Sequence, residues 1–182
     1  MSLLERLILA ILLFRRLGRT ERDRPQPATS GARGMVLLAG DSYAVGLEEP
    51  LRDQLRARGR TMHWTGASGL RTEQVIERAR WVMAQFPDAS VLVVSCGAND
   101  ASVNGANLTD AVLAAREFQE TAPLPVLWLS PPSTARYWAS PAVGIGETLP
   151  VDLPLPDRQH PNAAGYRSWS EQIVRRLEEI NG

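Results

Sequence analysis

The sequence predicts an α/β fold, a three-layer α/β/α sandwich around a parallel sheet of four to five strands. From residue 35 onward, short apolar runs alternate with longer stretches in which apolar residues recur at helical spacing. Several of the apolar runs end directly in glycine or another small residue. Continuous short apolar runs are typical of strands that are buried on both faces, as they are in parallel sheets covered by helices on both sides.

The first half of this region contains two predicted strand–helix units. A compact apolar run at 35–39 is the first strand, and a helix at about 46–58 ends before Gly59, a residue suited to a helix C-terminus. The second strand is predicted at 61–65. The second helix is predicted at 72–85 because its apolar residues share one helical face. These residues are Val75, Ile76, Ala79, Val82 and Met83.

The second half repeats the pattern. The run at 90–96 is the strongest strand signal in the chain, and a helix at about 108–120 and a strand at about 125–129 follow it. The last helix begins near Asn162, a good N-cap residue. The predicted sheet is flavodoxin-like, with ligands expected at the carboxyl ends of its strands. The last helix carries a stripe of core residues, Tyr166, Trp169, Ile173, Leu177 and Ile180.

Composition excludes several kinds of chemistry. The 182 residues are enough for one domain with its own core, and the formal net charge of zero argues against a nucleic-acid partner. The chain has no lysine, which excludes a Schiff base or a P-loop lysine. Cys96 is the only cysteine, so no intrachain disulfide can form, and His63 has no second ligand at metal-binding spacing. We therefore expect no metal and no cofactor.

The N-terminal part differs from the rest of the chain. We expect a hydrophobic helix at 1–17, a flexible linker at 18–34 and the main folded domain at 35–182. The apolar run at 7–14 is too short to span a bilayer, which needs about 20 residues. It fits a tag-like terminus or a helix packed on protein as well as an anchor at a membrane surface. An export signal fits less well, because Glu5 precedes the run and arginines follow it. The location, whether membrane-associated, exported or cytoplasmic, stays open.

Small and polar residues follow three of the predicted strands. Asp41 and Ser42 follow the first strand, a glycine-rich turn with Gly69 follows the second, and Asn99 lies in the segment after the third. A fourth segment, 157–162, leads into the last helix. Because the carboxyl ends of parallel strands meet at one edge of a sheet, we expect all four segments to border one crevice.

These segments contain the parts of a serine hydrolase. A serine hydroxyl becomes a nucleophile when a histidine takes its proton and an acid orients that histidine, roles that Ser42, His160 and Asp157 can fill. Candidate donors to the oxyanion that forms in acyl transfer are the backbone N–H groups of Ser42 and Gly69 and the side-chain amide of Asn99. The sequence thus predicts an esterase site.

The four segments resemble, in order, the conserved blocks of the SGNH, or GDSL, hydrolases. The matching segments are Gly-Asp-Ser-Tyr at 40–43, Ala-Ser-Gly at 67–69 with Thr72, Gly-Ala-Asn-Asp at 97–100, and Asp-x-x-His-Pro-Asn at 157–162 with Gly165 and Tyr166. The resemblance implies esterase or lipase activity, with the nucleophile in the first block. In one respect the chain departs from this pattern, because residues 133–156 lack the usual helix and strand and are predicted as an irregular loop beside the site.

We therefore predict a serine esterase or acylhydrolase that cleaves a carboxylic ester of a small molecule or a glycan through an acyl-serine intermediate. One alternative is an O-acetyl esterase or O-acyltransferase that acts on a glycan. Another is a binding or structural module that keeps the fold without catalysis, with 1–17 contacting a membrane surface or a protein partner. The ester itself is not predicted by these motifs.

Several residues in this region admit a second interpretation. Ser68 is the rival nucleophile, but Leu70 stands where a nucleophile elbow would have its second glycine. Asp152 is the rival acid, with a longer separation from His160. Structural roles are expected for Asp41 and Asp100, which would bond loop backbone, and for His63 and Cys96, while Trp128 fits either the core or a pocket wall.

Overall fold

The computed structural model describes most of the chain from residue 34 onward. The segments predicted as an N-terminal helix and linker, Asp152, and most of the predicted loop lie outside the described residues. Within the described part, no helix is long and apolar enough to cross a membrane. The described residues are 34–101, 108–130, 147–149, 155–157 and 160–180.

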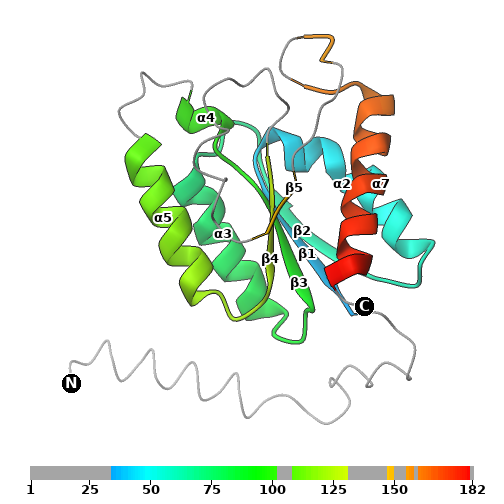
Figure 1. Ribbon diagram of the computed structural model, residues 1–182, viewed down its shortest axis with the longest axis horizontal. Helices are drawn as coiled ribbons and strands as arrows, with labels where there is room; N and C mark the ends of the chain where they lie inside the picture. Colours follow the sequence, from blue (N-terminus) through cyan, green and yellow to red (C-terminus); the bar gives the residue numbers. More distant parts are fainter. Residues whose placement is uncertain (1–33, 102–107, 131–146, 150–154, 158–159, 181–182) are drawn as a thin grey trace, which may run out of the picture. The chain divides into compact units, whose positions relative to one another are not determined.

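The described strands form one parallel five-stranded sheet in the order β2-β1-β3-β4-β5. This order is that of a flavodoxin-like, doubly wound sheet. The predicted fold class is therefore confirmed (Figure 1). The strands are β1 (Val36–Gly40), β2 (Met62–Gly66), β3 (Val91–Ser95), β4 (Val126–Leu129) and β5 (Glu147–Leu149).

Helices cover both faces of the sheet (Figure 1). Helices α2 (Ser42–Arg56) and α7 (Ala163–Ile180) pack together on one face, and α3 (Thr72–Gln85) and α5 (Leu108–Thr121) pack together on the other. Successive strand residues point to opposite faces. Leu38 accordingly joins the core under α2 and α7, while Leu37 joins the core under α3 and α5. Both are fully buried, which explains why the strands read as unbroken apolar runs.

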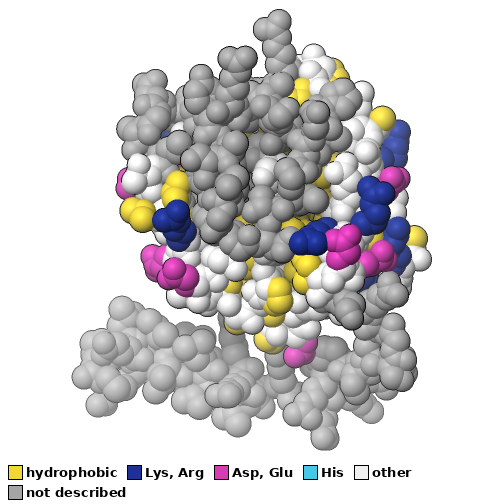
Figure 2. Space-filling model, viewed as in Figure 1, with side chains coloured by type: hydrophobic (Ala, Val, Ile, Leu, Met, Phe, Trp, Pro, Cys, Tyr) yellow, Lys and Arg dark blue, Asp and Glu magenta, His cyan; other side chains and the backbone are white. Residues whose placement is uncertain are grey.

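On the outside of α2 and α7, opposite charges lie side by side. Arg52 pairs with Glu48 at 2.8 Å along α2, and Arg58 of the α2 C-terminal turn pairs with Glu178 of α7 at 3.2 Å. The space-filling view shows basic and acidic side chains as neighbours on both flanks of the molecule (Figure 2). Such exposed pairs contribute little to stability, about 1 kcal/mol or less each.

The predicted start of the first helix is wrong by about one turn, since α2 begins at Ser42 instead of near residue 46. Asp41 is the N-cap, and its side chain accepts a hydrogen bond from Tyr43 N–H, which allows the helix to start directly after β1. Gly46 lies inside the helix where α2 meets α7. A Cβ atom there would come within 2.1 Å of the Tyr166 ring, so the glycine permits this close approach.

The prediction of an irregular loop over 133–156 is wrong at Glu147–Leu149, which form the edge strand β5 beside β4. Three residues with a single large apolar side chain give little signal, and the strand depends on its pairing with β4. A short helix, α4 (Ala98–Ala101), also begins within the segment that was predicted only as a strand end. Helix α4 lies at the carboxyl end of the strands, whereas β5 lies alongside β4 as part of the sheet (Figure 1).

Candidate active site

The carboxyl ends of the neighbouring strands β2, β1 and β3 lie at the same level. Gly40 of β1 is in register with Gly66 of β2 on one side and with Ser95 of β3 on the other. Two further hydrogen bonds continue this pairing beyond the strands, from Ala67 N to Gly40 O at 3.2 Å and from Asp41 N to Ser95 O at 3.0 Å. The segments that follow these strands therefore begin side by side.

Ser42 is the first residue of α2 and is partly buried. Its backbone N–H is one of the first four amides of the helix, which have no carbonyl partner within the helix. The helix dipole places partial positive charge at this end. A negative charge that forms on an atom bound near Ser42 would therefore be stabilised by the start of α2.

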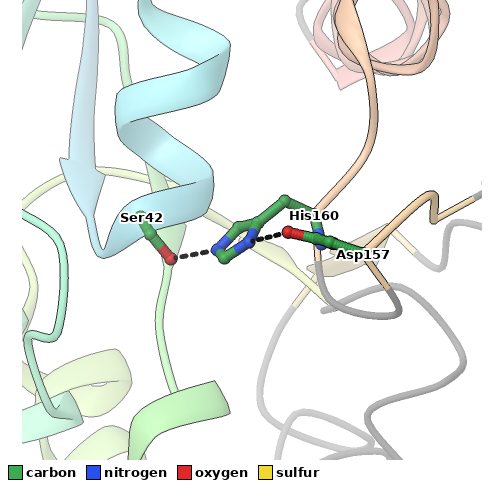
Figure 3. A network of polar contacts seen from close by, with 3 residues as sticks. All are labelled: Ser42, Asp157 and His160. Atoms are coloured by element: carbon green, nitrogen blue, oxygen red, sulfur yellow. Dashed lines mark hydrogen bonds and ion pairs between the residues drawn. The ribbon is translucent and has the colours of Figure 1, made fainter.

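Ser42, His160 and Asp157 form a continuous hydrogen-bonded series (Figure 3). Ser42 Oγ lies 2.9 Å from His160 Nε2, and His160 Nδ1 lies 3.0 Å from Asp157 Oδ2. The backbone N–H of His160 also donates to the other oxygen of Asp157. With the proton on Nδ1, the imidazole donates to the carboxylate and leaves Nε2 to accept the proton of Ser42 Oγ.

The turn that carries the histidine is fixed by the helix that follows it. Asn162 Oδ1 accepts a hydrogen bond from Gly165 N at 2.9 Å, the N-cap arrangement predicted for the start of α7. The side chain of Asp157 is 58% exposed and that of His160 is 36% exposed. The exposure of Asp157 means that water screens its charge, and its two hydrogen bonds to His160 orient the imidazole ring.

The turn after β2 and helix α4, which carry the two other oxyanion candidates, are joined to each other. Asn99 Nδ2 donates to Leu70 O at 2.9 Å, and Asp100 Oδ2 accepts hydrogen bonds from Thr72 N at 2.9 Å and Thr72 Oγ1 at 2.8 Å. Gly69 has a φ of +81°, a left-handed conformation that favours glycine. The structural role expected for Asp100 is confirmed, since it caps the start of α3 and ties α4 to it.

Asp41 is the most buried carboxyl group near Ser42, with 0% of its surface exposed. Oδ1 accepts hydrogen bonds from Tyr43 N–H and from the Ser95 hydroxyl, each at 3.1 Å. Within the described part of the chain, Oδ2 has no hydrogen-bond partner. Burial raises the pKa of Asp41 to about 7, against the opposing effect of these hydrogen bonds and of the nearby His160. Asp41 therefore holds loop backbone, as expected.

No role was predicted for two residues near the site, Ser95 and Tyr43. Ser95 bonds Asp41, and the Tyr43 ring lies beside His160 with centroids 5.2 Å apart. The signal for Ser95 is a polar residue at the end of an otherwise apolar strand. That Ser95 bonds Asp41, however, depends on the register of β1 and β3, which the sequence does not show.

The remaining candidates have structural positions. His63 is exposed and stacks on Phe86 with ring centroids 3.8 Å apart, and Ser68 is exposed in the turn after β2. Cys96 is buried, which raises the pKa of its thiol. Trp128 belongs to the core and donates to Gln119 Oε1 at 2.7 Å, so it is not a pocket wall. In the described residues no group of three or more His, Cys, Asp or Glu side chains could hold a metal ion.

No family model and no curated protein matches the sequence. Solved structures do match the fold. The esterase EstA from Pseudoalteromonas sp., solved inhibited by monoethylphosphonate, aligns with a TM-score of 0.66 and 15% identity over 82% of this chain and 100% of that chain. A protein from Desulfitobacterium hafniense described as lipolytic and of the G-D-S-L family aligns with a TM-score of 0.61 and 17% identity, over 79% and 99% of the two chains.

A third structure is a catalytic mutant of Axe2, an acetylxylan esterase from Geobacillus stearothermophilus. It aligns with a TM-score of 0.58 and 16% identity over 80% of this chain and 94% of that chain. At these identities the similarity concerns the fold alone. The chain therefore has the α/β fold of the SGNH/GDSL-type hydrolases.

Proposed function

We propose that this protein is an SGNH-type serine hydrolase that cleaves carboxylic esters through an acyl-Ser42 intermediate. The observation that carries the proposal is the hydrogen-bonded series from Ser42 Oγ through His160 to Asp157, with distances of 2.9 and 3.0 Å. A serine, a base and an orienting acid in this order are the arrangement that activates a hydroxyl for acyl transfer. Its place at the carboxyl edge of a parallel sheet, where such folds bind ligands, supports the proposal further.

The reaction follows from the positions of the three side chains. His160 Nε2 takes the hydroxyl proton while Ser42 Oγ attacks the ester carbonyl carbon, and the carbonyl oxygen becomes an oxyanion. As the tetrahedral intermediate collapses, the C–O bond to the alcohol breaks and His160 gives its proton to the departing oxygen. Water then attacks the acyl-serine by the same route in reverse, which releases the acid and restores Ser42. Asp157 keeps the imidazole in the productive tautomer.

The oxyanion would be bound by N–H groups at the start of α2, in the turn after β2 and on a side chain of α4. Ser42 N–H, Gly69 N–H and the Asn99 amide are the proposed donors. The hydrogen bond of Asn99 to Leu70 O supports this assignment, because it joins the Asn99 amide to the residue that follows Gly69. Removal of one such donor typically lowers the rate by about 10²- to 10³-fold.

The decisive experiment compares two serine variants. Ser42→Ala should abolish both hydrolysis of an activated ester such as p-nitrophenyl acetate and covalent labelling by a fluorophosphonate probe. Ser68→Ala is the matched control, because Ser68 is an exposed serine in a neighbouring loop and was the rival nucleophile. It should keep both activities. Full hydrolysis by folded Ser42→Ala would refute the proposal, and loss of labelling only in Ser68→Ala would move the nucleophile to that residue.

A second candidate is deacetylation of a glycan or transfer of its O-acetyl group, which uses the same acyl-serine intermediate. The fold similarity to the acetylxylan esterase Axe2 favours this candidate. Incubation with acetylated xylan, with acetate release and transfer to added sugar alcohols measured separately, distinguishes hydrolysis from transfer. If the protein neither reacts with the phosphonate nor releases any acid while it binds a partner, it is a non-catalytic module.

A further inference from the structure

Asp41 and Ser95 are joined by two hydrogen bonds. Asp41 N donates to Ser95 O at 3.0 Å, and Ser95 Oγ donates to Asp41 Oδ1 at 3.1 Å. Both side chains are buried, with exposed fractions of 0% and 2%. The backbone bond from Asp41 N to Ser95 O continues the parallel pairing of β1 with β3. The side-chain bond adds a second link, because it joins the carboxyl group of Asp41, the N-cap of α2, to the hydroxyl of the same serine.

This pair connects the two sides of the candidate site. Asp41 immediately precedes Ser42 and accepts the N-cap hydrogen bond from Tyr43 N–H at 3.1 Å. Ser95 is the last residue of β3, four residues before Asn99. The helix that carries the nucleophile is thus fixed to the strand that leads to the proposed oxyanion donor.

The space around the pair is tightly filled. A Cβ atom at Gly40 would lie 2.5 Å from Ser95 O and 3.0 Å from Ser95 Cβ, so the end of β1 and Ser95 are in direct contact. Interiors packed at this density shift little, and small displacements are transmitted to neighbouring atoms. Loss of the Ser95 hydroxyl would therefore alter the Asp41 carboxylate first and the start of α2 next.

We propose that Ser95 is a positioning residue for Ser42, acting through Asp41. The inference rests on the proposed serine hydrolase function. Ser95 does not touch substrate; its hydroxyl fixes the Asp41 side chain, which caps α2 and so sets where Ser42 Oγ lies relative to His160 Nε2. Reacting atoms must be held closely, since a misplacement of about 1 Å can lower a rate by ~100-fold.

The test compares Ser95→Ala with Ser90→Ala. Ser90 is a matched control, because it lies just before the opposite end of β3 and its Oγ also bonds across the fold, donating to Met35 O at 3.0 Å. Each variant is assayed with a p-nitrophenyl ester, and turnover is expressed per serine labelled by the fluorophosphonate. Thermal unfolding is recorded in parallel. This normalisation removes any effect of misfolded protein.

We expect both variants to unfold at lower temperature but only Ser95→Ala to lose activity per labelled site. Its kcat should fall by about 10-fold or more with KM within about twofold, because the altered geometry matters in the transition state and not in ground-state binding. Ser95→Cys keeps the side-chain size and a weak donor, so its kcat should lie between those of Ser95→Ala and the wild type. This variant also serves if Ser95→Ala does not fold.

Two results would overturn the inference. One is wild-type kcat per labelled site in Ser95→Ala, and the other is an equal loss in Ser90→Ala. Failure of the proposed function looks different, since the wild-type protein would then neither react with the probe at Ser42 nor turn over the ester.

Discussion

The Tyr43 ring and the His160 imidazole lie beside each other with centroids 5.2 Å apart and an angle of 45° between their planes. Tyr43 directly follows Ser42, so the first turn of α2 carries the nucleophile and also contacts its base. Tyr43 also contacts Trp169 of α7, edge-on with ring centroids 6.0 Å apart. The imidazole is thus positioned by hydrogen bonds at both of its nitrogens and by the packing of Tyr43, which is 3% exposed.

Tyr43→Ala should therefore reduce both stability and activity. Truncation of a buried aromatic residue costs about 3–5 kcal/mol of unfolding free energy, and His160 loses a neighbour that limits its motion. Phe118→Ala is the control, because Phe118 is equally buried but packs against Trp128 on the other face of the sheet. Denaturant unfolding should show similar losses for both variants, whereas kcat per labelled serine should fall only for Tyr43→Ala. An equal fall for Phe118→Ala would contradict a specific role of Tyr43.

Asp157→Asn should lower kcat by roughly 10²- to 10⁴-fold with little change in the melting temperature. The variant keeps an oxygen that can accept from His160 N–H, but its amide nitrogen would face Nδ1 and favour the tautomer with the proton on Nε2. That tautomer cannot take the proton of Ser42. Because Asp157 is largely exposed, its replacement should not affect folding.

Asp152→Asn is the companion variant, since Asp152 was the rival acid from the sequence and lies outside the described residues. Steady-state kinetics on the same ester should give wild-type kcat. If Asp152→Asn were the impaired variant and Asp157→Asn the active one, the acid of the triad would have to be reassigned.

Asn99→Ala tests the oxyanion assignment. We expect kcat to fall by about 10²- to 10³-fold with KM little changed, because a donor to the oxyanion acts on the transition state. Gln74→Ala is the control, because it also removes an amide side chain. The Gln74 amide oxygen accepts a hydrogen bond from Arg71 N at the start of α3. Its kinetics should match the wild type. A rise in KM without a fall in kcat for Asn99→Ala would indicate a substrate-binding role instead.

Most of the sheet was predictable because buried parallel strands are continuous apolar runs. The runs at 91–95 and 126–129 lie inside their predicted ranges, and the helix at 72–85 has the predicted bounds. The start of α2 was missed for two reasons. Gly46 weakens the helical signal of the first turns, and the helix begins directly after the strand, with Asp41 between them as its N-cap. The edge strand β5 was missed because pairing with β4, a tertiary interaction, outweighs its weak local signal.

The candidate site shows the same division between local and tertiary information. The three-residue spacing of Asp157 and His160 predicts that one turn presents both, and the structure places them at 3.0 Å. The contact of His160 with Ser42 joins residues 118 positions apart. It was predictable because both segments were expected to border one crevice and because they match the first and last blocks of the hydrolases that the sequence resembles. The bond between Ser95 and Asp41 depends on strand register, which composition and periodicity do not determine.

Asp41 leads to a prediction about stability and pH. Burial raises its pKa from 3.8 to about 7, so between these values the folded protein keeps a proton that the unfolded chain has lost. Linkage then requires stability to fall as pH rises from about 4 to about 7 and this contribution to become constant above about 7. At low pH the neutral carboxyl is tolerated in the core, whereas at high pH the fold must hold a buried charge.

Asp41→Asn isolates this effect, because the amide is neutral throughout and keeps an oxygen that can accept from Tyr43 N–H and the Ser95 hydroxyl. Unfolding free energies of wild type and variant are measured with urea at intervals from about pH 4 to about pH 8. Their difference cancels every other titrating group that the two proteins share. It should shift in favour of the variant as pH rises toward about 7 and then remain level, because only the wild type must ionise a buried side chain. Parallel stability curves would mean that Asp41 ionises as readily in the folded protein as in the unfolded chain. Its burial opposes that outcome, as does its Oδ2, which has no hydrogen-bond partner among the residues that the structure describes.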